Sequence, residues 1–251
     1  MINVLVCGIG GKMGENIVAL LNGDTGAQVV CGVDLHKPEN CKVPVYSSFD
    51  GVEEKVDVII DFSSPAVIKS ELDWAVENGV PAVIASTGFT AEQLKFIDCC
   101  AEKIAIFRTA NFSLGVNLLV KLVREAAEAL GESFDIEIIE KHHNKKVDAP
   151  SGTALMLADS ANKAFGNAKS YLNGREGNAG KRGNEIGLHA VRGGTIVGEH
   201  DVMFAGEDEI ITLSHSARSK RVFAAGAIKA AKWLAGKSSG KYDMTDVLEN
   251  I

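Results

Sequence analysis

The sequence lacks paired cysteines, an excess of basic residues and long apolar runs. Its five cysteines are odd in number and show no CxxC spacing, which indicates free thiols in a reducing cytoplasm. The formal net charge of -7 disfavours an electrostatic grip on nucleic acid. Because no apolar run approaches membrane-spanning length, we expect no membrane segment, and the first residues lack the pattern of a signal peptide.

Proline (5 residues) and aromatic side chains (6%) are also scarce, whereas glycine is plentiful at 26 residues. Turns in this chain therefore depend on glycine. A chain of 251 residues buries a sizeable core without metal or disulfide cross-links, as one large domain or two smaller ones.

The N-terminal part alternates short apolar runs with segments of helical periodicity. Helical spacing begins after a glycine-rich loop at 8–14, and further helices are expected over 67–78 and 91–102. The apolar runs predict strands over 2–7, 27–33, 56–60, 80–85 and 104–107. This order predicts a Rossmann-like parallel sheet covered by helices, in which ligands bind at the carboxyl ends of the strands.

The remainder predicts an α+β domain with a mostly antiparallel, open sheet. Helices are expected over 117–130, 154–165 and 222–235, and an alternating strand over 134–140. Segments 188–192 and 195–200 suggest a hairpin with a two-glycine turn, and a second turn at 205–208 leads to a strand over 209–215. Residues 166–185, rich in Gly, Asn, Lys and Arg, suggest a mobile loop.

The glycine-rich loop directly follows the first strand and opens a helix. Its G-x-G-G-x-M-G pattern departs from the strict dinucleotide fingerprint, and a glycine cluster alone also fits an ordinary tight turn. Asp34 strengthens the nucleotide interpretation, because it ends the second strand twenty residues after Gly14. We therefore expect a dinucleotide site. The loop residues assigned to it are Gly8, Ile9, Gly10, Gly11, Lys12 and Met13.

Asp34 also bears on which cofactor binds. A carboxylate there accepts from the adenosine ribose 2′-hydroxyl, and Leu35 places no arginine beside it, which favours NADH. Lys12, His36 and Lys37 offer cations for a 2′-phosphate, so NADPH stays a second candidate. Each of these three is otherwise an ordinary solvated charge.

Two later loops follow strands that should end near the nicotinamide. They are commonplace in sequence, and only their position in the predicted sheet makes them cofactor-binding candidates. Their residues are Ala85, Ser86 and Thr87 in the first loop, and Thr109, Ala110, Asn111 and Phe112 in the second.

The densest chemistry lies in residues 140–154, where two His and three Lys fall within six residues directly after a strand. Ser151 is a plausible N-cap of the next helix, whose start offers N–H donors and a positive dipole end to a carboxylate. A neighbouring His exchanges protons near neutral pH. The arrangement suits a small dianionic substrate that is protonated during the reaction.

Other interpretations of this segment are a solvated basic loop beside an ordinary capped helix, a metal site and a nucleic-acid contact. Adjacent His residues on an extended segment point to opposite sides, and no third ligand has suitable spacing, so we expect no metal. The net charge disfavours nucleic acid. Glu140, which ends the alternating strand, is expected to pair with a lysine at most.

The same segment resembles the signature of the 4-hydroxy-tetrahydrodipicolinate reductase (dihydrodipicolinate reductase) family, E-x-x-E-x-H-H-x-x-K-x-D-A-P-S-G-T-A. The matching residues are Glu137, Glu140, His142, His143, Lys146, Asp148 and 149–154. The resemblance extends over most of the chain, including Gly180–Gly183 and the segment from Arg192 to His200. Departures are Lys12 in place of an arginine, Ala85-Ser86-Thr87 in place of Gly-Thr-Thr, and Leu35 where some members have an arginine.

The resemblance implies a bacterial cytoplasmic enzyme of the diaminopimelate route to lysine, usually a homotetramer. NADH or NADPH reduces 4-hydroxy-tetrahydrodipicolinate to tetrahydrodipicolinate. In the family, the positions of His142 and Lys146 have proton-donor roles and that of His143 contacts substrate. Gly152 and Thr153 match backbone donors to a substrate carboxylate, with Ser151 nearby.

The family also implies a domain arrangement. Residues 1–112 and 222–251 should form the dinucleotide-binding domain, and 113–221 the domain for substrate binding and oligomerisation. Hinges are expected near 111–115 and 218–222. Residues 166–187 are a candidate lid over bound ligands, the alternative being a plain surface loop.

Two other functions compete with the reductase. A different dinucleotide-dependent dehydrogenase, acting on an amino acid or an aldehyde, would explain the glycine loop and Asp34 but not the string from His142 to 154. A nucleotide-sensing module without turnover would be expected to lack the proton donors, yet His142 and Lys146 are both present. The partner expected in each case is a small molecule.

Overall fold

The computed structural model describes residues 1–39 and 41–250, and the chain divides into two compact units. Unit 1 comprises residues 1–112 and 221–251, and unit 2 comprises residues 113–220. The chain passes from unit 1 to unit 2 after residue 112, which is the boundary suggested by the sequence. It returns to unit 1 after residue 220, one residue earlier than expected. Within the described residues, every helix is too short or too polar to cross a membrane.

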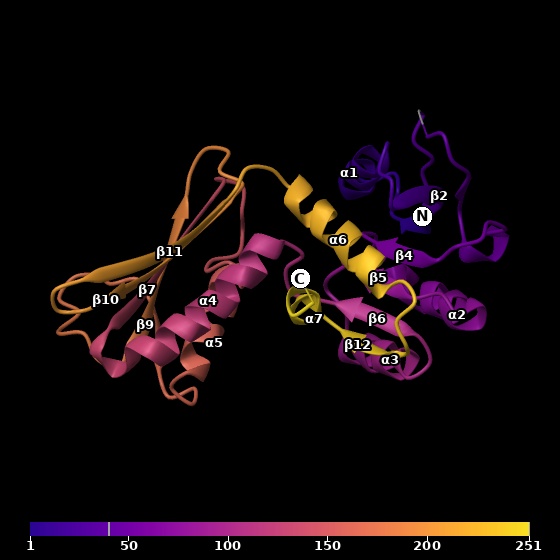
Figure 1. Cartoon of the computed structure of the whole chain (residues 1–251). Helices are drawn as coiled ribbons and strands as arrows, with labels where there is room; N and C mark the ends of the chain where they lie inside the picture. The colour runs from indigo at the N-terminus through magenta and orange to yellow at the C-terminus, as the bar shows by residue number, and fades with distance from the viewer. Residues whose placement is uncertain (40, 251) are drawn as a thin grey trace. The chain divides into compact units, whose positions relative to one another are not determined.

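Unit 1 contains a seven-stranded parallel sheet with the strand order β12-β6-β5-β4-β1-β2-β3 (Figure 1). Its strands are β1 (Ile2–Cys7), β2 (Ala27–Val33), β3 (Val45–Tyr46), β4 (Val58–Asp61), β5 (Ala82–Ile84), β6 (Ala105–Arg108) and β12 (Gly240–Tyr242). This confirms the Rossmann-like sheet. The edge strands β3 and β12 were not expected, because two or three residues are too few to show a hydrophobic period.

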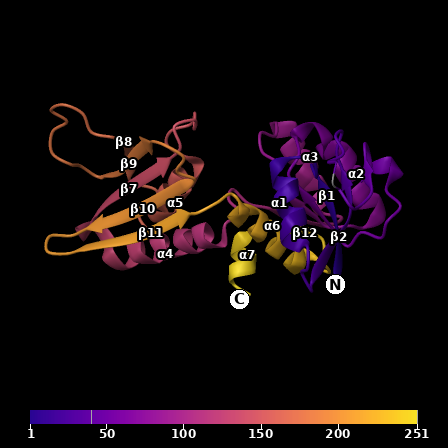
Figure 2. The ribbon, with the colours of Figure 1, turned by 90° about the horizontal axis from the view of Figure 1, so that it is seen from above.

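Helices cover both faces of this sheet, which explains why its central strands are continuous apolar runs. Helix α1 packs against α6, whereas α2 packs against α3 on the opposite face (Figures 1 and 2). The helices of unit 1 are α1 (Lys12–Leu21), α2 (Ile68–Asn78), α3 (Ala91–Ala101), α6 (Arg221–Leu234) and α7 (Met244–Leu248), with 3-10 turns η1 (Phe49–Gly51) and η2 (Pro65–Val67).

Unit 2 contains a five-stranded sheet with the order β11-β10-β7-β9-β8, and helices α4 and α5 pack against one of its faces (Figure 2). Its elements are α4 (Leu114–Leu130), η3 (Gly131–Ser133), β7 (Asp135–His142), α5 (Gly152–Lys163), β8 (Ser170–Asn173), β9 (Glu185–Arg192), β10 (Gly198–Ala205) and β11 (Ile210–Ala217). Burial alternates along β7 and β10, as expected for strands with one core-facing side. Ile136, Ile138, Val202 and Phe204 form the centre of that core with α5.

Two expectations for unit 2 were wrong. Strands β9 and β10 do not form a hairpin, because β7 lies between them and pairs parallel with β9 and antiparallel with β10. Gly193 and Gly194 instead pair with the backbone just after β7, at His142 and Asn144. The sheet is therefore mixed, with β8 also parallel to β9. Alternation in sequence reveals a half-buried strand but not its neighbour.

The expected loop over 166–185 was also too long. It contains β8 and the first residue of β9, so only residues 174–184 connect the two strands. Strand β8 is exposed along its whole length, so no buried apolar face marks it in the sequence. The end of this connection is held to β7, since Arg182 pairs with Glu137 and donates to the carbonyl of Ile136.

The interior of α6 offers a stability prediction. At Gly226, an added Cβ would overlap the backbone carbonyl of Phe112. Alanine normally favours a helix interior over glycine by about 1 kcal/mol. Here we expect Gly226→Ala to lower the free energy of unfolding by about 2 kcal/mol in urea titrations, because backbone atoms must move apart. The exposed neighbour Ala225→Gly should cost only the propensity term of about 1 kcal/mol. A G226A protein as stable as the parent would contradict this packing.

Candidate active site

A buried carboxylate lies near the end of β7. Glu140 is fully buried, and its side chain lies on the same face of the strand as His142 because their spacing is two residues. Its Oε2 lies 2.6 Å from His142 Nδ1, and the Arg192 guanidinium donates to both carboxylate oxygens at 2.7 and 2.8 Å. The Ser151 amide completes the shell at 3.0 Å. The expected pairing of Glu140 with a lysine was wrong.

These donors decide the charge of Glu140. Burial raises the pKa of a carboxyl, but hydrogen bonds from Arg192, His142 and Ser151 outweigh burial and hold the pKa of Glu140 below its ordinary value. An ionised Glu140 requires a proton on His142 Nδ1. The other ring nitrogen, Nε2, is therefore the one left to exchange a proton with a ligand.

A second histidine contacts the first. His200 stands opposite Glu140 in the β10–β7 register, and its ring meets that of His142 edge-on at 5.2 Å between centroids. Its Nε2 lies 3.0 Å from Ser151 Oγ. Burial first, and then the nearby His142, lower the pKa of His200 to about 4. His200 is thus a neutral hydrogen-bonding group at neutral pH.

The start of α5 presents amides beside this pair. Ser151 is confirmed as the N-cap, since its hydroxyl accepts from the Ala154 amide at 3.2 Å. Gly152 is exposed, and an added Cβ there would meet nothing within 4 Å. First-turn amides and the helix dipole together favour a carboxylate at Gly152 and Thr153.

The loop between β7 and α5 carries the remaining cations. Lys146 Nζ lies 2.8 Å from Asp148, and the Asp148 carbonyl accepts from Arg192 at 2.7 Å. Arg192 therefore links this loop to Glu140. His143 is half-buried, and its Nδ1 is buried without a hydrogen-bond partner in the described structure. The structure thus brings together the five expected residues His142, His143, Ser151, Gly152 and Thr153 with Lys146 on one loop and strand end.

Unit 1 carries the nucleotide candidates at the carboxyl ends of its parallel strands. The glycine loop follows β1, Asp34 follows β2, 85–87 follow β5 and 109–112 follow β6. Within the loop, Gly8 has a φ of 81°, and a Cβ on Gly14 would overlap the backbone of Ile9. Gly11 caps α1 without a side-chain hydrogen bond, which leaves first-turn amides for a phosphate.

Asp34 also shapes this loop. Its two carboxylate oxygens accept from the amides of Gly10 at 2.9 Å and His36 at 3.0 Å. Leu35 beside it is 83% exposed. The carboxylate is therefore fixed at the strand end, where a ribose would lie in a Rossmann-like site.

Four expected cofactor residues have side chains that are otherwise engaged. The Ser86 hydroxyl donates to buried Asp61, the Ile9 side chain fills the space over Gly32, and the Phe112 ring packs against Phe62 and Phe107. The Thr109 hydroxyl donates to the carbonyl of Asn111 and accepts from its amide. Only the backbones at these positions, or a rearranged hydroxyl of Ser86 or Thr109, are left for a nucleotide. Lys12, Thr87 and Ala110 are exposed, whereas Met13, Ala85, Thr109 and Asn111 are half-buried.

Comparisons with known proteins decide the family. Residues 2–112 match the family model of dihydrodipicolinate reductase, N-terminus, and residues 115–248 match that of the C-terminus. The chain belongs to the dihydrodipicolinate reductase family. It is 50% identical, over 99% of both chains, to the 4-hydroxy-tetrahydrodipicolinate reductase of Caldanaerobacter subterraneus subsp. tengcongensis. The Clostridium novyi enzyme of that name is 43% identical over 100% of this chain and 99% of its own.

Solved structures agree with this dihydrodipicolinate reductase assignment. The dipicolinate-bound dihydrodipicolinate reductase from Paenisporosarcina sp. TG-14 matches with a TM-score of 0.81 and 30% identity, over 100% of this chain and 99% of that one. A dehydrogenase from Thermotoga maritima, at 12% identity and a TM-score of 0.62, shares the fold alone.

Several residues of this reductase site were not assigned a role from the sequence. Arg192 and His200 were matched only as part of the family resemblance, and Asp148 only as part of the signature. Arg192 and His200 lie 50 or more residues from His142 in the chain, so local spacing carried no signal for their contacts. The sheet pairing β9–β7–β10 brings them together.

We expect Glu140→Gln to lower kcat of the reductase by about 100-fold, because the amide no longer fixes the His142 tautomer. Unfolding free energy should also fall by about 3 kcal/mol, since Arg192 loses its buried partner. Steady-state kinetics and urea titration measure the two effects. Glu199→Gln, which alters a half-exposed ion pair of neighbouring β10, is the control and should change either quantity little. A kcat within twofold of the parent would remove Glu140 from the site.

His200 predicts how stability depends on pH. Its pKa is about 4 when folded and ordinary, at 6.5, when unfolded. The unfolded chain therefore binds more protons between these values, and stability falls as pH decreases through that window. Between pH 7.5 and 4.5 the parent should lose about 2–3 kcal/mol more than His200→Asn, which cannot take up this proton. Equal losses in both proteins, measured by urea titration, would contradict the prediction.

Proposed function

We propose that this chain catalyses the NAD(P)H-dependent reduction of 4-hydroxy-tetrahydrodipicolinate to tetrahydrodipicolinate, in the diaminopimelate route to lysine. The observation that carries the proposal is the Glu140–His142 pair, which lies beside the Ser151-capped start of α5. The pair would act as an oriented proton carrier next to a site for an organic carboxylate, in a member of the dihydrodipicolinate reductase family.

The substrate part of the proposal rests on unit 2. The Paenisporosarcina relative is described as dipicolinate-bound, and dipicolinate is a planar dicarboxylate. In this chain, the amides of Gly152 and Thr153 would hold one carboxylate, with Ser151 capping the same helix start. His143 and Lys146 would meet the charge of the other. Lys146 then exchanges its partner Asp148 for the substrate.

The cofactor part rests on unit 1, where the residues fit a dinucleotide. Gly8, Gly10, Gly11 and Gly14 keep side chains out of the loop, so a pyrophosphate meets backbone amides; Ile9, Lys12 and Met13 complete that loop. The nicotinamide supplies a hydride when bound. Segments 85–87 and 109–112 would contact it through their backbones and through the hydroxyl of Thr87, since the Thr109 hydroxyl is bonded to Asn111.

Proton transfer is the work of the unit 2 residues. Hydride addition to a conjugated imine moves electron density onto the ring nitrogen. A cationic or proton-donating group placed there stabilises that density as it develops. His142, held by Glu140 through Nδ1, presents Nε2 as the donor, and Lys146 supplies a second cationic donor close by.

Asp34 favours NADH over NADPH in this proposal. Its carboxylate is fixed by two amides and would repel a 2′-phosphate while accepting from a ribose hydroxyl. Leu35 offers no opposing charge. Lys12 and Lys37 are exposed cations, and His36 is an exposed hydrogen-bonding group, which together keep NADPH usable.

Further parts of the proposal concern assembly and location. Unit 1 is the dinucleotide-binding domain, and unit 2 is the domain for substrate binding and oligomerisation in a homotetramer. Exposed apolar residues on the second face of the unit 2 sheet support this, including Val191 at 46% and Ile210 at 63% exposure. A cytoplasmic location follows from the biosynthetic role. The lid role, now confined to residues 174–184, is part of the same proposal.

The deciding experiment follows absorbance at 340 nm with NADH and with NADPH, using substrate generated fresh by the preceding synthase. Consumption that depends on the substrate is expected with both cofactors and faster with NADH. No consumption by protein that binds NADH would favour another dehydrogenase or a nucleotide sensor. Faster reaction with NADPH would overturn only the interpretation of Asp34.

Substitutions separate the two proton carriers. We expect His142→Gln to lower kcat by at least about 100-fold with little change in NADH affinity, because it removes the donor and leaves unit 1 unaltered. Lys146→Ala should lower kcat and raise KM for the substrate, because the lysine also meets a carboxylate. Lys145→Ala, an exposed neighbour, is the matched control. Parent-like kinetics in H142Q or K146A would remove that residue from the mechanism.

A further inference from the structure

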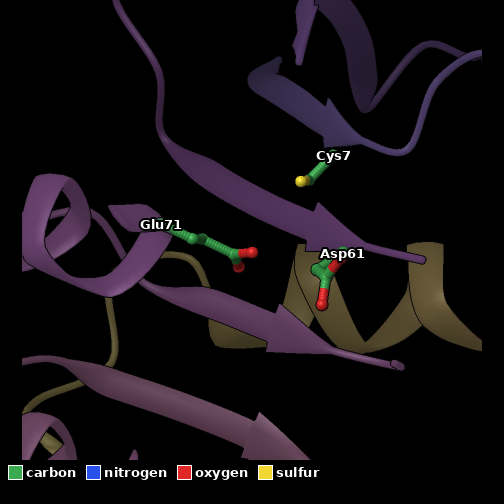
Figure 3. A group of neighbouring side chains, drawn as sticks. All are labelled: Cys7, Asp61 and Glu71. Atoms are coloured by element: carbon green, nitrogen blue, oxygen red, sulfur yellow. The ribbon is translucent and has the colours of Figure 1, made fainter. Parts of the chain in front are cut away.

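Unit 1 contains a buried group of three acids that the reductase chemistry does not use. Cys7 ends β1, Asp61 ends β4, and Glu71 lies in the first turn of α2. Their side chains point toward one another (Figure 3). One sulfur or oxygen atom from each lies within 4.8 Å of the other two, and all three residues are buried.

Glu71 is the unexplained member of this group. It is 0% exposed, and neither of its carboxylate oxygens has a hydrogen-bond partner among the described residues. Burying a carboxyl group without a partner is costly, so native proteins rarely leave one in that state. In the described part of the chain, no lysine, arginine or histidine forms an ion pair with any of the three acids.

Hydroxyl groups contact the other two members of this group. Asp61 accepts from the Ser63 amide at 2.7 Å, from the Ser63 hydroxyl and from the Ser86 hydroxyl. Such hydrogen bonds orient a ligating carboxylate. The Cys7 thiol donates to Ser63 Oγ at 3.4 Å, and it would give up that proton when an ion binds. Neither oxygen of Glu71 is engaged by a hydrogen bond, so both are left for an ion.

We propose that Cys7, Asp61 and Glu71 form a binding site for one divalent transition-metal ion of the zinc class. One thiolate and two carboxylates suit Zn²⁺, whereas the sulfur ligand disfavours Mg²⁺ and Ca²⁺. Around tetrahedral Zn²⁺, such ligand atoms lie about 3.3–3.5 Å apart, given bonds of about 2.0 Å to oxygen and 2.3 Å to sulfur. Small side-chain rotations bring the three atoms from their present separation to that geometry.

The ion would be structural rather than catalytic. It would join the ends of two neighbouring parallel strands, β1 and β4, to the start of α2. Cys7 directly precedes the glycine loop, so the ion would hold the base of that loop. The sequence hides this site, because its residues are separated by 54 and by 10 positions and form no short metal-binding motif.

The test uses the full-length chain, expressed with added Zn²⁺ and also refolded from urea with Zn²⁺, then desalted. Mass spectrometry of the metal should find one zinc per parent chain in at least one preparation, with a Tm above that of chelator-treated protein. A Co²⁺ preparation should show a thiolate-to-metal charge-transfer band. Cys7→Ser and Glu71→Gln should lose the zinc and the band. Cys100→Ser, which alters another buried cysteine of unit 1, should keep both.

Two results would overturn the proposal. The first is a parent chain without zinc in either preparation, which would mean that Cys7, Asp61 and Glu71 hold protons in place of a metal ion. The second is zinc retained in C7S and E71Q at the parent level, which would place it elsewhere. If either variant fails to fold, the Co²⁺ band must persist when the other four cysteines, Cys31, Cys41, Cys99 and Cys100, are replaced by serine, which leaves Cys7 as the source of the thiolate. Neither result bears on the proposed reductase activity, because zinc content and the Co²⁺ band are both measured without turnover.

Discussion

Unit 2 depends on one buried negative charge. The charge is that of the fully buried Glu140 carboxylate. Four groups form hydrogen bonds with it: two nitrogens of Arg192, the His142 ring and the Ser151 amide. Those partners come from β7, β9 and the start of α5. Removing the charge would leave the half-buried Arg192 guanidinium with only its two backbone carbonyl acceptors, so the carboxylate fixes the relative placement of a strand pair and a helix. The candidate proton carrier and the candidate carboxylate site are thereby positioned by the same two oxygens.

In unit 1, the candidate nucleotide site is formed mainly by backbone groups. The parallel sheet brings four loops to one edge, and glycines keep that edge free of side chains. Several residues expected to bind the cofactor instead stabilise their own loops, as Ser86 does with Asp61 and Phe112 with Phe62. The candidate site of unit 2 therefore consists mainly of side chains, whereas that of unit 1 consists mainly of backbone groups.

The extent to which the sequence predicts this molecule varies with the range of the interaction. Continuous apolar runs and glycine punctuation predict the Rossmann-like sheet, because both faces of its strands are buried. The N-cap at Ser151 and the Glu140-x-His142 spacing are local and visible in the sequence. The order of strands in unit 2 is not, since alternation says which face of β9 and β10 is buried but not that β7 separates them. Contacts made by Arg192 and His200 depend on that order and could not be predicted from the residues alone.

The hydrogen bond from the Gly10 amide to Asp34 has a consequence for how cofactor preference changes during evolution. The residue proposed to select the ribose also anchors the loop proposed to receive the pyrophosphate. A mutation that removes the carboxylate to admit a phosphate would therefore loosen the loop at the same moment. Lineages that switch cofactor are expected to acquire a new acceptor for that amide first or together with the change. Loss of the Asp34 carboxylate and gain of a new acceptor are therefore epistatic. Their order is constrained because the Gly10 amide needs a hydrogen-bond acceptor throughout.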